Sequence, residues 1–324
     1  FHLPSWLILA PFKSDPVCHS PSAACSTSSR HSRNDSKSSW RVAARECECG
    51  CECEWIPLAP ASVAPAEKAI AYLPADRSEK AALYLPEKFE DGKKYPGVLI
   101  IHGGGWTGGK RDAARKINIG TTLAAHGYVC MSIDYLLHDA KSDKLCWPQN
   151  LHDCKTAVRW IACEQDRLHL DAAHIGVIGG SAGGHLSCLV DVTGPGDGLD
   201  PSGPYGEQSC AVNSVVDMYG PTDVENWKDI AALPQNRQQA PRFQAFSVLT
   251  QLDKDDPPFL ILHGTADTAV PLSQSEILAA ALKEAGIPYQ LEIIEDAPHS
   301  FHLQPKQKDL RPLGLTFFDK YLKP

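Results

Sequence analysis

The feature that most constrains this chain is one serine set among four glycines, between a short apolar run and a segment with helical character. The stretch reads Ile175-Gly-Val-Ile-Gly-Gly-Ser-Ala-Gly-Gly-His-Leu186 and contains the pattern G-x-S-x-G around Ser181. A serine on a tight turn from strand to helix has strained backbone angles, and small residues two positions away on each side let strand and helix approach. Gly179 and Gly183 occupy those positions. The pattern therefore predicts a nucleophile elbow that raises the Ser181 hydroxyl above the edge of a sheet.

Apolar segments on both sides of this elbow alternate between two patterns. Residues 95–101 form a continuous apolar run, which is typical of a strand buried on both faces. The other expected strands are 69–73, 81–85, 128–133, 174–178, 212–218, 258–262 and 289–294, and the expected helices are 113–126, 151–165, 182–191, 272–285 and 310–322. The first two strands are expected to pair antiparallel. The alternation predicts the α/β class, with a mainly parallel, doubly wound sheet and helices on both faces.

Two stretches interrupt the alternation, and a segment of different composition precedes it. Residues 194–209 and 221–256 are rich in Pro, Gly, Asn and Gln, so we expect loops or a small partial cap over the carboxyl edge of the sheet. Residues 1–54 combine a serine-rich tract with the run Cys47-Glu-Cys-Gly-Cys-Glu-Cys53. This composition favours a disordered, low-complexity leader over a metal site, because zinc ligands are usually spaced C-x2-C. One domain is therefore expected over residues 55–324.

Charge and hydropathy exclude some classes of partner. The 324-residue chain has a formal net charge of -8, and the acidic excess lies in residues 55–324. That balance argues against a nucleic acid or an anionic membrane surface as a partner. No apolar run reaches the roughly 18 residues of a transmembrane helix. Residues 1–12 are apolar but lack a preceding basic region, so the sequence leaves the compartment open between export and the cytoplasm. It also leaves open a monomer or a small homo-oligomer.

Three more motifs come directly after expected strands. His102-Gly-Gly-Gly-Trp106 follows the expected strand at 95–101. Leu262-His-Gly-Thr-Ala-Asp267 carries an aspartate just beyond the end of the expected strand at 258–262. His299 follows the strand at 289–294. The chain order Ser, Asp, His, each in a loop after a strand, predicts a triad of Ser181, Asp267 and His299.

Backbone NH groups are the second chemical component of this pattern. Without Cβ atoms, the glycines after residue 101 let NH groups turn toward a substrate carbonyl. The candidate oxyanion donors are Gly104, Gly105 and Ala182, the last in the first turn of the helix after the elbow.

Together these motifs resemble a known family over residues 66 to 324. The chain is similar to α/β hydrolase esterases with an H-G-G-G-W oxyanion motif, above all the bacterial feruloyl and acetylxylan esterases, and to the hormone-sensitive lipase-like esterases. The resemblance implies an α/β hydrolase fold and a serine carboxylesterase that needs no metal or organic cofactor. It also implies a small-molecule or polymer ester as substrate, of the short-chain acyl, feruloyl, acetyl-sugar or aromatic polyester type. Residues 1–54 lie outside the resemblance.

Two other functions stay open. A serine exopeptidase or amidase of the prolyl oligopeptidase type resembles this chain in its Asp and His loops, although no propeller repeats are present. A non-catalytic binding module with this fold usually lacks the nucleophile or the base, and both are present here.

Other polar residues near these motifs receive secondary roles. His302 is the alternative base, and Asp217 and Asp296 are the alternative acids. His102 is expected to order the glycine loop, and His185 is expected to pack on the helix beside the serine. Asp153 is expected to be solvated on a helix.

Aromatic residues at the expected mouth of the site are candidates for contacting substrate. They are Trp106, Trp147, Tyr219, Trp227 and Phe301, of which Trp106 adjoins the oxyanion glycines. The cysteines outside the leader give two further expectations: buried free thiols at Cys130 and Cys188, and an open question of a disulfide among Cys146, Cys154, Cys163 and Cys210.

Overall fold

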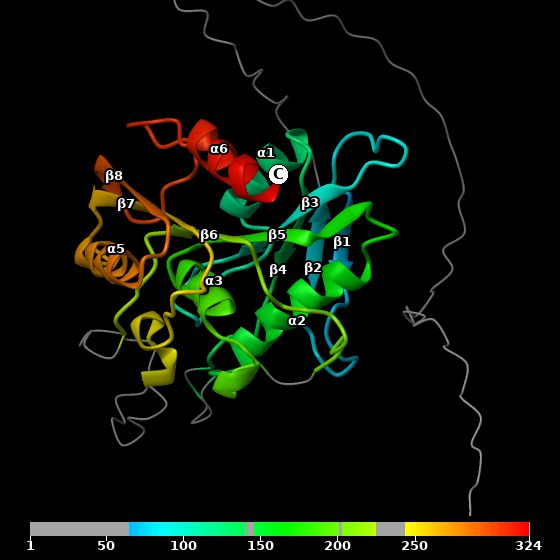
Figure 1. Ribbon diagram of the computed structural model, residues 1–324, viewed down its shortest axis with the longest axis horizontal. Helices are drawn as coiled ribbons and strands as arrows, with labels where there is room; N and C mark the ends of the chain where they lie inside the picture. The colour runs from blue at the N-terminus through cyan, green and yellow to red at the C-terminus, as the bar shows by residue number, and fades with distance from the viewer. Residues whose placement is uncertain (1–64, 140, 142–145, 201–202, 225–243, 324) are drawn as a thin grey trace, which may run out of the picture. The chain divides into compact units, whose positions relative to one another are not determined.

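A computed structural model describes residues 65–139, 141, 146–200, 203–224 and 244–323 (Figure 1). The predicted leader at 1–54 and the candidate substrate contact Trp227 lie outside these residues. The strands are β1 (Glu67–Ile70), β2 (Ala81–Tyr84), β3 (Tyr95–Ile101), β4 (Val129–Ile133), β5 (Leu170–Gly180), β6 (Ser214–Met218), β7 (Phe259–Ala266) and β8 (Tyr289–Pro298). The main helices are α1 (Ala114–Ala125), α2 (Gln149–Cys163), α3 (Ala182–Val192), α5 (Ser273–Ala285) and α6 (Arg311–Leu322).

The strands form one sheet in the order β1-β2-β4-β3-β5-β6-β7-β8. Neighbouring strands from β4 to β8 in that order pair parallel, whereas β2 pairs antiparallel with both β1 and β4. From β3 the chain adds β4 on one side, and from β5 onward it adds strands on the other side, so the order of strand addition reverses between β3 and β5. Open α/β sheets bind ligands at such a switch point, outside the carboxyl ends of the strands. The predicted doubly wound sheet is therefore confirmed, and its topology marks one place for a site.

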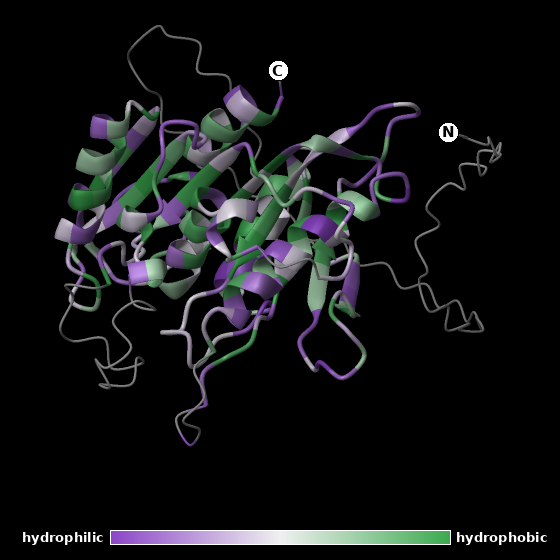
Figure 2. Ribbon diagram, turned by 60° about the horizontal axis from the view of Figure 1, so that its bottom comes forward, coloured by the Kyte–Doolittle hydropathy of each residue, from purple (hydrophilic) through white to green (hydrophobic). Residues whose placement is uncertain are grey.

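Helices cover both faces of this sheet (Figure 1). One apolar core joins α1 and α6 to one face, and a second core joins α2, α3 and α5 to the other. All residues of β3 are buried, as its continuous apolar run predicts. Figure 2 shows the inner strands as the most hydrophobic part of the fold, with purple patches on the outer surfaces of the helices. None of the helices in the described ranges is long and apolar enough to cross a membrane.

Of the predicted segment at 194–209, residues 194–200 and 203–209 lie at the opposite edge of the sheet from the one predicted. The segment connects the end of α3 to the start of β6, and the parallel strands begin at that edge. There Arg159 of α2 forms an ion pair with Asp200. The prediction that this segment caps the carboxyl edge is therefore wrong, because a connection from a helix back to a parallel strand returns to the amino edge. In the second predicted cap segment, residues 225–243 lie outside the described part of the chain.

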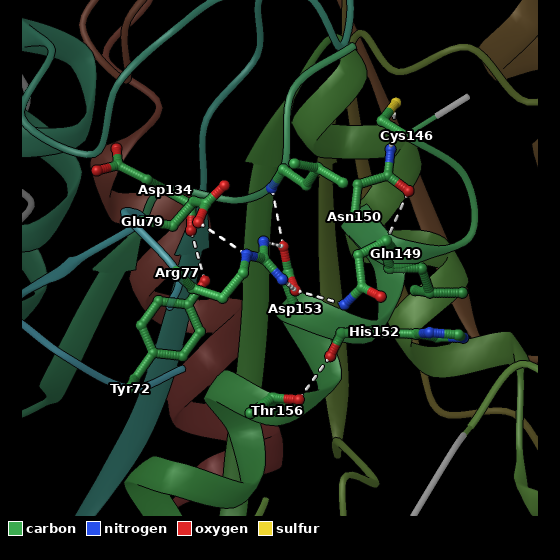
Figure 3. A network of polar contacts seen from close by, with 12 residues as sticks. Tyr72, Arg77, Glu79, Asp134, Cys146, Gln149, Asn150, His152, Asp153 and Thr156 are labelled. Atoms are coloured by element: carbon green, nitrogen blue, oxygen red, sulfur yellow. Dashed lines mark hydrogen bonds and ion pairs between the residues drawn. The ribbon is translucent and has the colours of Figure 1, made fainter. Parts of the chain in front are cut away.

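Asp153 is the second correction, because it is fully buried rather than solvated. Figure 3 shows its carboxylate at the centre of a polar network between α2 and the N-terminal strands. Arg77 donates to both of its oxygens, at 3.0 and 2.6 Å, and Gln149 and the backbone NH of Leu136 donate to it as well. A helix position that looks solvated in the sequence is thus buried, because a distant arginine pairs with it.

The described cysteines settle the question of a disulfide within the set named above. Cys146, Cys154 and Cys210 are free thiols, so no disulfide joins two of the four candidates. Cys130 and Cys188 are buried and free, as predicted.

Candidate active site

Ser181 sits on a sharp turn between β5 and α3. Its φ is 58° and its ψ is -127°, a region that costs a non-glycine residue about 1–3 kcal/mol. The flanking glycines are required by close contacts. A Cβ on Gly179 would lie 2.1 Å from the carbonyl oxygen of Gly183, and a Cβ on Gly183 would lie 2.3 Å from that of Ile101. These contacts give the physical reason for the G-x-S-x-G pattern.

Three side chains from separate loops form one hydrogen-bonded chain. The Nε2 atom of His299 lies 3.0 Å from the Ser181 hydroxyl oxygen, and its Nδ1 atom lies 2.6 Å from Oδ2 of Asp267. Asp267 follows β7 and His299 follows β8, and these strands pair parallel, so their ends bring the two loops together. His299, one of the three residues singled out by chain order, is therefore within hydrogen-bonding distance of the other two.

The Asp267 carboxylate has more donors than the histidine alone. The backbone NH groups of Ala269 and Val270 donate to its Oδ1 atom at 2.8 and 2.9 Å. The side chain is 1% exposed. Burial by itself would raise the pKa of Asp267, but hydrogen bonds from His263, His299 and these two NH groups hold it well below its usual range. The carboxylate is therefore ionised under all ordinary conditions.

His263 is a site residue that sequence reasoning missed. Its Nε2 atom lies 3.0 Å from the carbonyl oxygen of Val270 and 3.4 Å from Oδ2 of Asp267, and its Nδ1 atom lies 2.7 Å from the Ser275 hydroxyl. A carbonyl can only accept, so Nε2 carries the proton and faces the carboxylate as a donor. The signal was present in the sequence, since this histidine lies four positions before Asp267 in the quoted motif.

The glycine loop after β3 approaches the elbow from the neighbouring strand. A Cβ on Gly103 would lie 2.4 Å from the carbonyl oxygen of Gly180, so only glycine allows this approach. Gly104 and Gly105 have φ values of 128° and 59°, which L residues rarely adopt. Both line the same pocket as Ser181 and Ala182. All three predicted oxyanion donors therefore lie around the space next to the serine.

That pocket has a volume of about 570 Å³. It is lined by the glycine loop, by the elbow, by Tyr219 and His299, and by residues at the start of α1. Trp106, Ser181, Tyr219 and Ser300 all line it and all have positive φ. Strained non-glycine residues concentrate at functional sites because the surrounding fold holds them in place.

The candidate substrate aromatics divide into two groups. Trp106 and Tyr219 line the pocket, and the Tyr219 ring packs edge-on against His299 with centroids 4.9 Å apart. Trp147 and Phe301 do not line it. Trp147 packs against Phe246, and Phe301 packs against Tyr219, whose hydroxyl donates a hydrogen bond to the Phe301 carbonyl oxygen. The placement of Trp147 and Phe301 as pocket residues is therefore wrong: both are buried supports behind it.

The competing polar residues lie away from the Ser181 hydroxyl. His302 and Asp296 are exposed, and Asp217 is buried beneath the elbow and accepts from the NH of Gly220. Burial lowers the pKa of both His102 and His185 to about 4, so neither is charged at neutral pH.

Hydrogen bonds give those two histidines the structural roles expected of them. His102 Nδ1 lies 2.8 Å from the Gly103 carbonyl oxygen, and its ring stacks on Tyr135. His185 donates from Nε2 to the Phe246 carbonyl oxygen at 2.7 Å and packs against Trp106.

Residues 82–282, from β2 through most of α5, match the family model BD-FAE. The chain belongs to the BD-FAE family. Among curated proteins, this BD-FAE member is 28% identical over 247 residues to "Esterase LipQ" of Mycobacterium tuberculosis, covering 72% of the chain and 57% of LipQ. It is 27% identical to "Dipeptidyl peptidase 8" of Homo sapiens, covering 68% of the chain and 24% of the peptidase. The chain thus spans little more than half of the first relative and a quarter of the second.

A solved structure agrees with this membership at the level of the fold. The "truncated form of carbohydrate esterase from gut microbiota" superimposes with a TM-score of 0.68 at 24% identity, covering 79% of this chain and 95% of that one. The sheet, the elbow and the helices of this BD-FAE member together form an α/β hydrolase fold, as the motifs predict.

Proposed function

We propose that this chain is a serine carboxylesterase that hydrolyses small to medium carboxylic esters through an acyl-enzyme. The observation that carries the proposal is the hydrogen-bonded chain from Ser181 through His299 to Asp267 at the wall of a pocket. His299 takes the hydroxyl proton as Ser181 attacks the ester carbonyl, and Asp267 holds the tautomer and stabilises the imidazolium. The protonated His299 then gives its proton to the departing alcohol.

The negative charge of the tetrahedral intermediate meets backbone NH groups. Gly104, Gly105 and Ala182 are the donors in this proposal, and one such donor is typically worth about 3 kcal/mol in the transition state. Water repeats the attack on the acyl-enzyme, with His299 again as base, and releases the acid and free Ser181. Proton transfers balance over the cycle, so the chain needs no external acid or base.

Pocket size and relatives support the substrate class. A pocket of about 570 Å³ falls within the roughly 300–1,000 Å³ that holds small organic ligands. LipQ is named an esterase, and the solved structure from gut microbiota is named a carbohydrate esterase, so both relatives favour esters over amides. Short-chain acyl, feruloyl, acetyl-sugar and aromatic polyester substrates are the members of this class to be compared.

The likeness to a peptidase leaves a serine exopeptidase as the alternative function to be tested. A serine exopeptidase could use the same kind of triad, and the chain is similar to dipeptidyl peptidase 8. Release of an amine requires protonation of a poor leaving group, so an enzyme built for esters discriminates strongly against anilides.

The experiment compares turnover of p-nitrophenyl esters of rising chain length, methyl ferulate, acetylated xylan, a soluble aromatic polyester fragment and an aminoacyl anilide. We expect ester hydrolysis that falls at least about 1000-fold in Ser181→Ala and in His299→Ala, with little change in melting temperature. His302→Ala is the matched control and should retain activity. Labelling by a fluorophosphonate should add mass to the native chain and none to Ser181→Ala. A chain that is neither labelled nor active on any ester would be a binding module instead.

A further inference from the structure

The pocket beside Ser181 carries positive charge in a chain whose net charge is -8. Lys110, Arg115 and Lys116 line it, and no Asp or Glu is among its lining residues in the described part of the chain. Lys110 is exposed at the rim, and Arg115 already donates to the Ser300 carbonyl oxygen, next to His299. These three cations give the pocket a sign opposite to that of the whole protein.

Lys116 is the least expected of the three. The side chain is 3% exposed and lines the pocket, and within the described residues its ammonium has neither a hydrogen bond nor an ion pair but still reaches solvent through the pocket. Burial, together with the neighbouring Arg115 charge, lowers the pKa of Lys116 to about 7. A buried charge without a partner is costly, and folded proteins normally satisfy it. The other buried lysine, Lys155, follows that rule and donates to the Thr193 carbonyl oxygen.

The start of α1 adds a second unsatisfied group at the same place. The N-cap residue is Ala113, which lines the pocket and has no side-chain oxygen to accept from the first turn. The Lys116 NH donates to the Ala113 carbonyl oxygen, but within the described residues the NH groups of Ala114 and Arg115 have no acceptor, and the helix dipole makes this end positive. Acidic residues normally occupy this turn, but α1 has none there and places Arg115 and Lys116 in it. Like charges therefore converge on a pocket that no Asp or Glu of the described residues lines, and Asp112, just before the helix, is exposed.

We propose that the pocket takes esters bearing a free carboxylate, which Lys116 and the uncapped start of α1 bind while Ser181 attacks the ester. A carboxylate supplies the acceptor that the Lys116 ammonium and the Ala114 and Arg115 NH groups lack, and its negative charge favours the protonated form of Lys116. Charge-assisted bonds in a site shielded from water are stronger than neutral ones. This inference rests on the proposed esterase function and names the substrate class of the same site.

The test compares matched ester pairs that differ only in the carboxylate. One pair is mono-p-nitrophenyl glutarate and its neutral methyl ester, which places the carboxylate on the acyl side. The other pair is 3-acetoxybenzoate and methyl 3-acetoxybenzoate, with acetate release measured, which places it on the alcohol side. We expect the acid form to exceed its neutral partner at least about tenfold in kcat/KM for one of the pairs.

Lys116→Met keeps the apolar stem and removes the charge. It should abolish the preference, measured as the ratio of kcat/KM for the acid form to kcat/KM for its neutral partner, and its stability should not fall because a desolvation cost is removed. Lys283→Met, on the exposed face of α5, makes the same change in net charge and should keep the preference. In native protein, glutarate monomethyl ester should compete with a neutral p-nitrophenyl ester more strongly than dimethyl glutarate does.

The failures of the two proposals can be told apart. Hydrolysis of neutral esters without any preference for the acid forms, in the native protein, would overturn the carboxylate site and leave the esterase intact. A preference that persists in Lys116→Met would overturn the assignment to Lys116. Absence of turnover on all four esters, with no fluorophosphonate labelling, would overturn the esterase itself.

Discussion

Replacing Asp153 by asparagine should destabilise the fold strongly, although the side chain keeps its size. All of the groups that contact this carboxylate are donors: two guanidinium nitrogens of Arg77, the Gln149 amide and the Leu136 NH. An asparagine amide nitrogen would have to face at least one of them. Two donors facing each other make no hydrogen bond, and the Arg77 charge loses its bidentate partner.

The magnitude follows from burial and from what Arg77 retains. Removing one partner of a buried ion pair costs about 3–5 kcal/mol. The Arg77 side chain is 19% exposed and keeps a hydrogen bond to Glu79 at 3.0 Å, which favours the lower end of that range. About 3 kcal/mol corresponds to a fall in melting temperature of roughly 6–12 °C for a domain of this size.

Urea denaturation of Asp153→Asn and native protein measures the difference, with the slope m as a check that both unfold in the same way. Asp166→Asn is the matched control, because its ion pair with Lys94 is exposed and should contribute less than about 1 kcal/mol. In a double-mutant cycle with Arg77→Met, the second substitution should cost much less than it does alone. A loss of under about 1 kcal/mol in Asp153→Asn, at unchanged m, would refute the reasoning.

His263→Leu should lower kcat by roughly 10- to 100-fold with a small change in KM, because a donor to the Asp267 carboxylate is lost, and steady-state kinetics on a p-nitrophenyl ester measures this. Burial raises the pKa of Asp217 to about 7 from 3.8, so its contribution to stability is present below pH 3.8 and is lost as pH rises to 7. Asp217→Asn has no carboxyl to titrate at this position. Denaturation at pH 4 and pH 8 should therefore show that the native protein loses about 2–4 kcal/mol of unfolding free energy relative to Asp217→Asn over this range. Equal pH dependence of the two proteins would contradict the raised pKa. Finally, kcat/KM for a short-chain p-nitrophenyl ester should exceed that for a matched aminoacyl anilide at least about 1000-fold, about 4 kcal/mol, and comparable rates would favour the peptidase.

The sequence was sufficient for those parts of the site that depend on backbone geometry. The elbow, the glycine loop and the positions of Asp267 and His299 after strands all follow from local rules: glycine where backbones nearly touch, and loops where parallel strands end. The contact between a Gly179 Cβ and the Gly183 carbonyl is a steric fact of one short segment. Motifs of this kind can be read without knowing what the rest of the chain does.

Contacts between side chains far apart in sequence were not predictable in this way. Asp153 looks like a solvated helix residue because Arg77, its partner, lies in an unremarkable loop before β2. Trp147 and Phe301 are aromatic residues close in sequence to the site motifs, yet Trp147 packs against Phe246 and Phe301 packs against Tyr219, and neither lines the pocket. Lys116 gives no signal at all, since an isolated lysine in a helix is usually at the surface.

The Asp153 network reaches the oxyanion loop through a single connecting segment after β4. Asp153 accepts from the NH of Leu136, and the preceding Tyr135 stacks on His102 and donates to its carbonyl oxygen at 2.9 Å. Two residues further on, the NH of His138 donates to the Trp106 carbonyl oxygen at 2.7 Å. The segment is thus bonded to both ends of the H-G-G-G-W motif and to the buried ion pair. Because the glycines between those ends have no side chains to fix them, their NH groups are held in position from outside the loop. The buried charge of Asp153 therefore supports the proposed oxyanion donors as well as the fold.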